Sequence, residues 1–183
     1  GRSSALDPAR ANTCGALQLL SAIGDTLYKR SANGDLQPSL ASAVPEISAD
    51  GRTITIPRRG DVFFHDGTRF DAEAMAFSLR RFLRIGRLNY IVGGRITAVE
   101  TPKPFLLRLR LSRPSTSLVN LLTSTNLTPV SPTAYRDYEN RALNDRFVGT
   151  GPYRLTYFRA VEQRLEPFDQ YWGEPPSNAG LDM

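Results

Sequence analysis

The adjacent residues His65 and Asp66 are the side chains of this 183-residue sequence best suited to acid–base chemistry. A histidine oriented by a carboxylate is a common form of general base. Catalysis would also need a nucleophile and an oxyanion donor, and no serine, cysteine or further carboxylate stands at a spacing typical of such a site. We therefore interpret the pair as part of a turn and expect no catalytic residue. A hydrolase using His65 is kept as an alternative.

Metal and phosphate chemistry are disfavoured by residue counts and spacing. His65 is the only histidine and Cys14 the only cysteine, so neither a metal cluster of these residues nor an internal disulfide can be assembled. The run Gly-Thr-Gly-Pro-Tyr at residues 149–153 lacks the Lys-Ser/Thr ending of a phosphate loop and does not open a predicted helix. We predict a turn that enters a strand there, and we expect neither a metal nor a cofactor.

The basic residues are 21 arginines and only two lysines, and the formal net charge is +5. Arg80, Arg84 and Arg87, with Arg81 beside them, have the spacing of a stripe opposite the apolar face of a helix. Such a stripe could bind phosphates, so a basic module that binds an anionic polymer such as nucleic acid is a second alternative. Because no aromatic stacking array or known nucleic-acid motif accompanies the stripe, we favour a solvated helix face and expect no nucleic-acid partner.

Two Asp-Gly pairs, at residues 50–51 and 66–67, predict tight turns because glycine tolerates positive φ. Residues 53–56 alternate apolar and polar side chains, and residues 62–64 form a second β-prone run. Together they predict a β-hairpin that leads directly into a helix.

That helix is predicted to have its N-cap at Asp71 and the acidic Glu73 in its positive first turn. Its apolar face recurs at the i, i+4, i+7 and i+8 positions, which are Met75, Leu79, Phe82 and Leu83.

The other predicted elements follow from the same signals of alternation, helical spacing and capping. They are a helix over residues 16–28, strands over 95–100 and 105–111 joined by a turn, a short helix over 117–122, a helix over 131–143 opened by Ser131 and Pro132, and strands over 153–159 and 161–166, with regular structure ending at residues 174–176. The sequence thus predicts an α+β fold with a mixed β-sheet flanked by helices.

The composition, with 40% hydrophobic and 22% charged residues, is that of a folded domain. No run of 18 apolar residues predicts a membrane span, and no charged segment followed by an apolar one marks a signal peptide. If the protein is exported, we expect its signal to have been removed or to lie outside this sequence. One cysteine gives no indication of the redox compartment.

Several motifs occur in the order found in a known family. The matching residues are Pro38, Leu40, Ala41, Asp50, Gly51, Thr53, Gly60, Val62, Phe64, His65, Asp66, Gly67, Thr68, Phe70, Ala72, Glu73, Phe77 and Arg80, together with Leu6-Asp7-Pro8, Asp25-Thr26-Leu27-Tyr28, Ser131-Pro132, residues 149–153 and Tyr171-Trp172-Gly173-Glu174. In these motifs the chain resembles the peptide/nickel-type (family 5) extracellular solute-binding proteins of ABC importers. It departs at Val44-Pro45, where the family often has a tryptophan, and at the arginine-rich residues 56–61.

The resemblance implies that residues 1–183 are the first lobe of a two-lobed protein, a periplasmic-binding-protein-like type II lobe. The second lobe and a C-terminal segment that returns to the first lobe would then lie outside this sequence. We expect a fragment of this kind to bind ligand weakly or not at all, since no second lobe closes over it. An open sheet edge could also lead to a non-native dimer.

The resemblance also implies a ligand site on three loops, comprising Asn12, Thr13 and Cys14, then Asn89 and Tyr90, then Thr125, Asn126 and Thr128. Each loop has a structural alternative, namely an ordinary helix N-cap, core packing of the tyrosine, and a solvated connector. Family members bind peptides, nickel chelates, opines or sugars, and a peptide is our expectation by analogy. The implied partner is an ABC permease, and the implied location is periplasmic or otherwise extracytoplasmic.

Overall fold

The computed structural model describes residues 6–86, 89–92, 94–138, 146–159, 162–176 and 181–182. Its helices are α1 (Cys14–Ile23), α2 (Ala72–Ile85) and α3 (Thr116–Leu121), with short 3-10 helices η1 (Asn89–Ile91), η2 (Thr125–Leu127) and η3 (Arg136–Tyr138). Its strands are β1 (Tyr28–Arg30), β2 (Leu36–Pro38), β3 (Glu46–Ile47), β4 (Thr53–Pro57), β5 (Ile96–Lys103), β6 (Leu106–Leu111), β7 (Tyr153–Arg159), β8 (Glu162–Pro167) and β9 (Leu181–Asp182). The predicted α+β class is confirmed.

The strands form three sheets, with the orders β1-β2, β3-β4-β6-β5 and β7-β8-β9. Every strand pair defined among the described residues is antiparallel, so the expected mixed sheet is replaced by antiparallel ones. In the four-stranded sheet, Ile54 pairs with Leu109 and Ile56 with Leu107. These four side chains are buried together and form the sheet side of the larger core.

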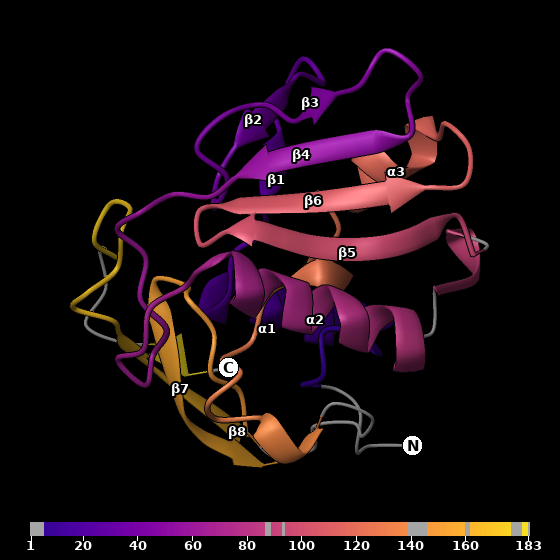
Figure 1. The fold of residues 1–183 in the computed structure, drawn as a ribbon. Helices are drawn as coiled ribbons and strands as arrows, with labels where there is room; N and C mark the ends of the chain where they lie inside the picture. The colour runs from indigo at the N-terminus through magenta and orange to yellow at the C-terminus, as the bar shows by residue number, and fades with distance from the viewer. Residues whose placement is uncertain are drawn as a thin grey trace.

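Helix α2 begins where it was predicted to begin, because the Asp71 side chain accepts a hydrogen bond from the Ala74 backbone N–H. Its buried face includes Met75, Leu79 and Phe82, which pack into the same core as the four-stranded sheet. The helix runs beside β5, with α1 behind it and β7 and β8 on the side away from the sheet (Figure 1). Helix α2 thus lies between the two halves of the molecule.

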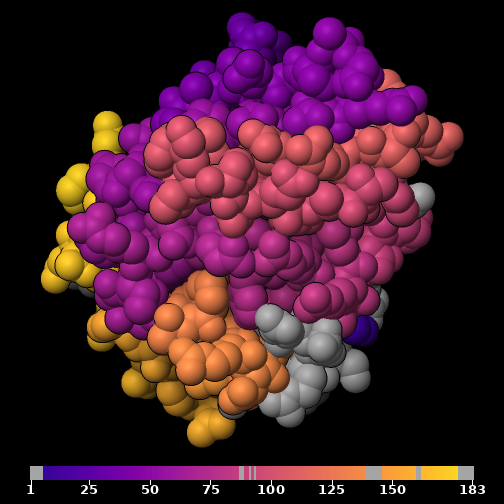
Figure 2. All heavy atoms as spheres, viewed as in Figure 1, coloured from indigo at the N-terminus to yellow at the C-terminus, as the bar shows by residue number. Residues whose placement is uncertain are grey.

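A second core surrounds α1, where Leu20 and Ile23 pack with Tyr135, Phe147 and Tyr153. The predicted helix over residues 16–28 was too long, because α1 ends at Ile23 with Gly24 as its C-cap. Tyr28 belongs to β1, and Leu27 packs in the other core. Figure 2 shows the two halves in contact along α2, with strands β5 and β6 covering one side of that helix.

Both predicted Asp-Gly turns are confirmed, since Gly51 has φ +69° and Gly67 has φ +83°. The predicted hairpin between residues 53–56 and 62–64 is wrong. The partners of β4 are β3 and β6, and Phe63 makes only an isolated bridge to Arg69. The side-chain alternation was read correctly, but the partner strand lies about fifty residues further along the chain.

The C-terminal half departs from prediction in two places. Ser131 accepts a hydrogen bond from the Ala134 N–H, but turns and the 3-10 helix η3 follow instead of an α-helix, and residues 139–143 of the predicted helix lie outside the described residues. Regular structure does not end at residue 176, because β9 pairs with β8. The predicted strands over 95–100, 105–111 and 153–159 and the short helix near 117–122 are confirmed.

Within the described part of the chain, no helix is both long enough and apolar enough to span a membrane.

Candidate ligand-binding site

The first of the three predicted loops enters α1. Thr13 is the N-cap of that helix, and its hydroxyl accepts a hydrogen bond from the Ala16 N–H at 3.2 Å. The capping alternative for this loop is therefore correct for Thr13. Asn12 and Cys14 are exposed on either side of the cap, so their side chains are accessible to a ligand.

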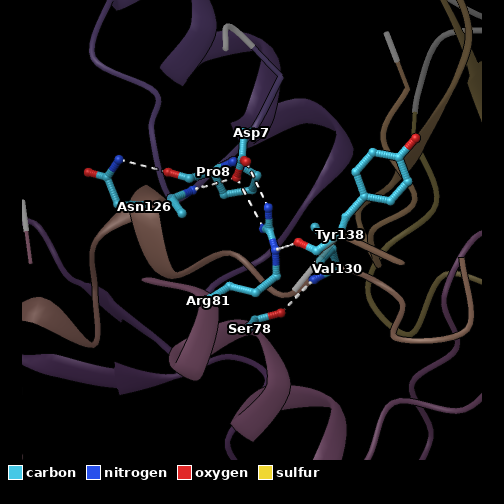
Figure 3. Close-up of polar contacts among 8 residues, drawn as sticks. Asp7, Pro8, Ser78, Arg81, Asn126, Val130 and Tyr138 are labelled. Carbon is cyan, nitrogen blue, oxygen red and sulfur yellow. Dashed lines mark hydrogen bonds and ion pairs between the residues drawn. The ribbon is translucent and has the colours of Figure 1, made fainter. Parts of the chain in front are cut away.

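Asp7 fixes the start of this loop. It lies in a turn in which the Asp7 main-chain carbonyl accepts hydrogen bonds from the Arg10 and Ala11 N–H groups. The Asp7 carboxylate forms a two-pronged ion pair with Arg81, in which Nη2 donates to Oδ2 at 2.7 Å and Nη1 to Oδ1 at 3.1 Å. Arg81 also donates from Nε to the Tyr138 carbonyl (Figure 3). Both charged side chains are almost completely buried, with 2% of Arg81 and 0% of Asp7 exposed.

The buried Arg81 corrects the predicted arginine stripe. Arg81 faces the protein interior, and the neighbouring Arg80 is engaged by Glu73 at 2.8 Å and by the Val99 carbonyl. Arg84 is exposed, and Arg87 lies outside the described residues. Arg81 therefore cannot contribute to an open phosphate-binding surface, and Arg80 is already engaged, which weakens the nucleic-acid alternative.

The third loop contains η2, and it contacts the first loop directly. The Asn126 side-chain amide donates to the Pro8 and Ala11 carbonyls, both at 2.8 Å, so it joins segments 118 and 115 residues apart. Asn126 is buried, and so is Thr128, whose hydroxyl donates to the Thr125 carbonyl. Only Thr125 of the three predicted residues is partly exposed. The solvated-connector alternative is thus wrong for Asn126 and Thr128.

The second loop lies at the other end of α2 from Asp71. The Asn89 amide donates to the Leu83 carbonyl at 3.1 Å, so it closes the end of the helix. Tyr90 is 71% exposed, so the core-packing alternative is wrong for this residue. An exposed tyrosine offers a ligand both a ring face and a hydroxyl group.

A cavity of about 370 Å³ opens at the C-terminal end of α1, next to the third loop. Its wall includes Leu20, Ser21, Gly24, Asp25 and Thr125, with Lys29 from β1 beside them. The sequence analysis found Thr125 and Thr128 here, but it missed Ser21, Asp25 and Lys29. In the sequence, Asp25 drew attention only as the first residue of the family motif Asp25-Thr26-Leu27-Tyr28.

Asp25 is 4% exposed and connects three distant parts of the chain. Its carboxylate accepts hydrogen bonds from the Thr150 hydroxyl at 3.0 Å, the Tyr171 hydroxyl at 3.1 Å and the Trp172 Nε1 at 3.0 Å. Burial raises the pKa of Asp25, while these donors and the Lys29 charge oppose the rise. Arg59 lies over the Trp172 ring at 4.4 Å, so this ring contacts a cation in addition to its hydrogen bond to Asp25.

His65 is structural, as the turn interpretation predicted. Its Nε2 lies 3.0 Å from the Gly151 carbonyl, and its ring packs edge-on against Phe168. Burial lowers the pKa of His65 to about 4, so the ring is neutral at physiological pH and donates its proton to that carbonyl. Asp66 caps the turn by accepting from Thr68 and Ser131 rather than from His65. Among the described residues, no group of three or more His, Cys, Asp or Glu side chains could hold a metal ion.

The model of the bacterial extracellular solute-binding proteins, family 5 (middle region), matches residues 35–183. The chain belongs to this family. The expected resemblance is confirmed. The members of this family are binding proteins rather than enzymes, and these binding proteins act in the periplasm or outside the cell.

Among curated family 5 proteins, the chain is similar to the glutathione-binding protein GsiB of Shigella flexneri. The two are 28% identical over 173 residues, which is 91% of this chain and 33% of GsiB. GsiB of Escherichia coli O157:H7 gives the same values. The chain therefore spans about a third of the length of the curated relatives it matches.

Solved structures of family 5 proteins match the chain over nearly its whole length. AgaA of A. tumefaciens R10, in complex with agropinic acid, is 26% identical with a TM-score of 0.83, and the match covers 100% of this chain and 37% of AgaA. An ABC transporter substrate-binding protein from Sinorhizobium meliloti is 25% identical with a TM-score of 0.85, covering 99% and 37%. NikZ of Campylobacter jejuni, at 22% identity and a TM-score of 0.84, shows the shared fold alone.

Proposed function

We propose that this chain is the first lobe of a family 5 solute-binding protein that captures a peptide outside the cytoplasm and delivers it to an ABC permease. In this proposal the second lobe is supplied by chain beyond these residues. Capture needs no covalent chemistry. It needs a surface of exposed polar and aromatic groups on a rigid frame.

The observation that carries the proposal is the contact between the first and third loops at the N-terminal end of α1. Asn126 ties the third loop to the carbonyls of Pro8 and Ala11, and the ion pair between Asp7 and Arg81 fixes the same turn from the other side. The frame is buried and charged, whereas Asn12 and Cys14 next to it are exposed. A fixed frame beneath accessible polar side chains suits ligand binding, because little backbone freedom of the loops is lost on association.

We assign the eight predicted residues to two groups within this proposal. Asn12, Cys14, Tyr90 and Thr125 are accessible and would contact the ligand, while Thr13, Asn126 and Thr128 would act as positioning residues that shape the loops. Asn89 would position Tyr90 through its hydrogen bond to the end of α2.

One relative favours a peptide as the ligand, and another favours a different kind of ligand. GsiB is a glutathione-binding protein, and glutathione is a small peptide. AgaA was solved with agropinic acid, which is not a peptide. We therefore propose a short peptide as the ligand. An opine-like acid is the alternative ligand that the test below can detect.

Native purification of the full-length protein, followed by mass spectrometry of the released ligand, tests the proposal. We expect short peptides to be recovered. A metal chelate, sugar or opine recovered in stoichiometric amount would overturn the peptide assignment while leaving capture and delivery in place. The absence of any ligand, together with no binding of a peptide library by calorimetry, would overturn both.

Substitution of the exposed aromatic residue separates ligand contact from folding. Tyr90→Ala in the full-length protein should weaken peptide binding by about tenfold, because a stacked aromatic ring contributes roughly 1 kcal/mol or more. Phe105→Ala is the matched control, since Phe105 is 49% exposed at the turn between β5 and β6. Equal affinities of the two variants would remove Tyr90 from the proposed site.

A further inference from the structure

A cavity of about 560 Å³ lies between α3 and the edge of the four-stranded sheet, and none of the eight residues assigned to the peptide site lines it. Much of its wall is apolar, with Ile47 from β3, Ile54 from β4, and Pro114 and Val119 on the opposite side. A Cβ atom placed on Gly51 would come within 2.9 Å of the Pro114 Cβ, so the turn before β4 closes one end. A cavity of this size with a mostly apolar wall is typical of small-molecule sites.

The polar part of the wall presents hydrogen-bond donors. Arg30, which is exposed on β1, donates from Nη1 to the Gly34 carbonyl at 2.9 Å and from Nη2 to the Asn120 Oδ1. A guanidinium group has five N–H groups, so most of them stay available on a side chain that is already held in one orientation. Because the Asn120 oxygen faces Arg30, the N–H₂ group of the same amide is left to donate to a ligand.

A second arginine acts on this wall through Ser115. The Arg95 Nη1 donates to the Ser115 hydroxyl oxygen at 3.0 Å, so the Ser115 proton remains for a ligand. The Arg95 Nε is buried and has no hydrogen-bond partner in the part of the chain that the structure describes. Within that part, neither Arg30 nor Arg95 forms an ion pair. Two uncompensated cations beside an apolar cavity favour a negatively charged ligand.

The nearest acidic side chains do not neutralise this charge. Among the described residues, no aspartate or glutamate lines the cavity. Glu46 precedes Ile47 on β3, and successive side chains of a strand point to opposite faces, so Glu46 lies on the face away from the cavity. The Asp50 carboxylate accepts hydrogen bonds from the Ser48 hydroxyl at 2.6 Å and the Arg52 N–H at 3.0 Å, within its own turn. An anion in the cavity would therefore contact no carboxylate.

We propose that this cavity binds a small amphipathic anion, a free acid with an aliphatic or aromatic body. Its acidic group would meet Arg30 and the Asn120 amide, and its body would lie on Ile47 and Val119. Ile47 is 50% exposed, so a ligand that covers it removes apolar surface from water. The site is separate from the proposed peptide site and does not depend on it.

Octanoate is the probe, and octanamide and butanoate are its matched controls. Octanamide keeps the apolar body and loses the charge, whereas butanoate keeps the charge and loses four methylene groups. In calorimetry on the full-length protein, octanoate should bind at least about tenfold more tightly than either control.

Each failure of this titration contradicts a different part of the proposal. Equal binding of octanoate and octanamide would remove the requirement for an anion, and equal binding of octanoate and butanoate would remove the apolar body. No binding of octanoate would overturn the site. If vesicles of phosphatidylglycerol sediment the protein and octanoate releases it, a membrane lipid replaces the free acid as the ligand.

Methyl NMR spectra locate the bound probe. With ¹³C label in the isoleucine δ1 methyl groups, octanoate should shift the signals of Ile47 and Ile54. Ile23, which packs in the core around α1, should keep its signal unchanged and serves as the internal control. Binding that leaves the Ile47 signal unmoved would place the octanoate elsewhere and overturn the assignment.

Removal of the anchoring cation tests the polar end of the cavity. Arg30→Met should weaken octanoate binding by about tenfold and leave octanamide binding unchanged, as expected for the loss of one charge-assisted hydrogen bond. Arg159→Met is the control, because Arg159 is exposed on β7 and also donates to a neutral oxygen, the Tyr157 hydroxyl. Both arginines are exposed, so neither variant is expected to alter the unfolding transition. An Arg30→Met protein with unchanged affinity for octanoate would contradict the proposal.

Truncation of the exposed isoleucine tests the apolar wall. Ile47→Ala should weaken the binding of octanoate and octanamide by the same factor, about fivefold, because both ligands lose apolar contact. Val44→Ala is the control, since Val44 is 60% exposed just before β3 but does not line the cavity. If Ile47→Ala binds both ligands as tightly as Val44→Ala does, the proposed apolar wall is wrong.

Discussion

The two ends of α1 are each held by a buried aspartate, and the two aspartates are stabilised in different ways. Before the helix, Asp7 meets the full charge of Arg81 in a two-pronged ion pair. After the helix, the groups that donate hydrogen bonds to Asp25 are the neutral side chains of Thr150, Tyr171 and Trp172, and the Lys29 charge adds to them. The buried carboxylate before α1 is thus compensated by the full charge of an arginine, whereas the one after α1 is stabilised mainly by hydrogen bonds from neutral groups.

The difference shows what each arrangement can tolerate. A buried ion pair depends on both members, since removal of one leaves an uncompensated charge in a site that excludes water. A carboxylate surrounded by neutral donors carries its own desolvation cost, which is why burial raises the pKa of Asp25. The Asp7 end should therefore be the more sensitive to substitution, and the stability contributed by Asp25 should depend on pH.

The largest expected effect is at the Asp7 end. Arg81→Met should lower the free energy of unfolding by about 3–5 kcal/mol, because the buried Asp7 carboxylate would lose the Arg81 charge that compensates it. Urea denaturation measures the change. Arg80→Met is the control. Arg80 directly precedes Arg81 on α2, and its exposed pair with Glu73 is worth less than about 1 kcal/mol. Equal costs for the two variants would refute the contrast between buried and exposed pairs.

The second-largest effect concerns the turn that contains Thr150, whose hydroxyl donates to Asp25. His65 is hydrogen-bonded to the Gly151 carbonyl in the same turn. Burial lowers the pKa of His65 from 6.5 to about 4, so its stabilisation is complete above pH 6.5 and is lost as the pH falls toward 4. The loss should approach about 3 kcal/mol across that window.

The variant His65→Gln isolates this effect because the chain has no other histidine. The stability of the unmodified protein minus that of the variant should be constant above pH 6.5 and should decline below it, as measured by urea denaturation at several pH values. A difference that stays flat down to pH 4 would show that His65 is not the titrating group.

At the Asp25 end, Asp25→Asn should cost about 1–3 kcal/mol at neutral pH, because the amide keeps one acceptor and turns an N–H₂ group toward other donors. The pKa of Asp25 is raised on folding, so its contribution to stability is complete below the ordinary carboxyl pKa and declines as the pH rises through the raised value. The cost of the substitution should therefore be greatest in acid.

Trp172, the only tryptophan of the chain, reports this site directly through its fluorescence. Its emission should shift in Asp25→Asn but not in the control Asp169→Asn, which alters an exposed residue three positions away. If Asp25→Asn cost more than Arg81→Met, the comparison between the two ends would have to be reversed.

The smallest effect is at the cap of α1. Thr13→Ala removes the hydroxyl that accepts from the Ala16 N–H and should cost about 1 kcal/mol, whereas Thr13→Ser should be nearly neutral. Thermal unfolding followed by circular dichroism is sensitive enough for this change. A Thr13→Ser variant as unstable as Thr13→Ala would mean that the methyl group, rather than the cap, stabilises this end.

Local sequence signals predicted much of the fold. The Asp71 cap and the spacing of Met75, Leu79 and Phe82 placed α2, and the alternation in residues 105–111 placed β6 with its buried face. The error at residues 16–28 has a physical cause. Leu27 and Tyr28 continue the helical spacing, but they pack into a different core from Leu20 and Ile23, so the chain must leave the helix between them.

The candidate site was predicted only in part for a similar reason. Thr13 and Tyr90 could be placed from their position beside helices, but the roles of Asn126 and Arg81 depend on partners elsewhere in the chain. Arg81 has the spacing of an outward-facing residue among its arginine neighbours, and only the approach of Asp7 makes its burial favourable.

The sequence by itself determined the turns at Gly51 and Gly67, the N-cap of α2 and the family to which the chain belongs, because each depends on residues close together or on motifs in order. The tertiary structure decided which strands pair, which arginine is buried and which polar groups surround the cavity. Asp7 and Arg81 are 74 residues apart, and Asp25 and Trp172 are 147. A local pattern carries no information about partners at that separation, since their contact exists only once the two cores have packed.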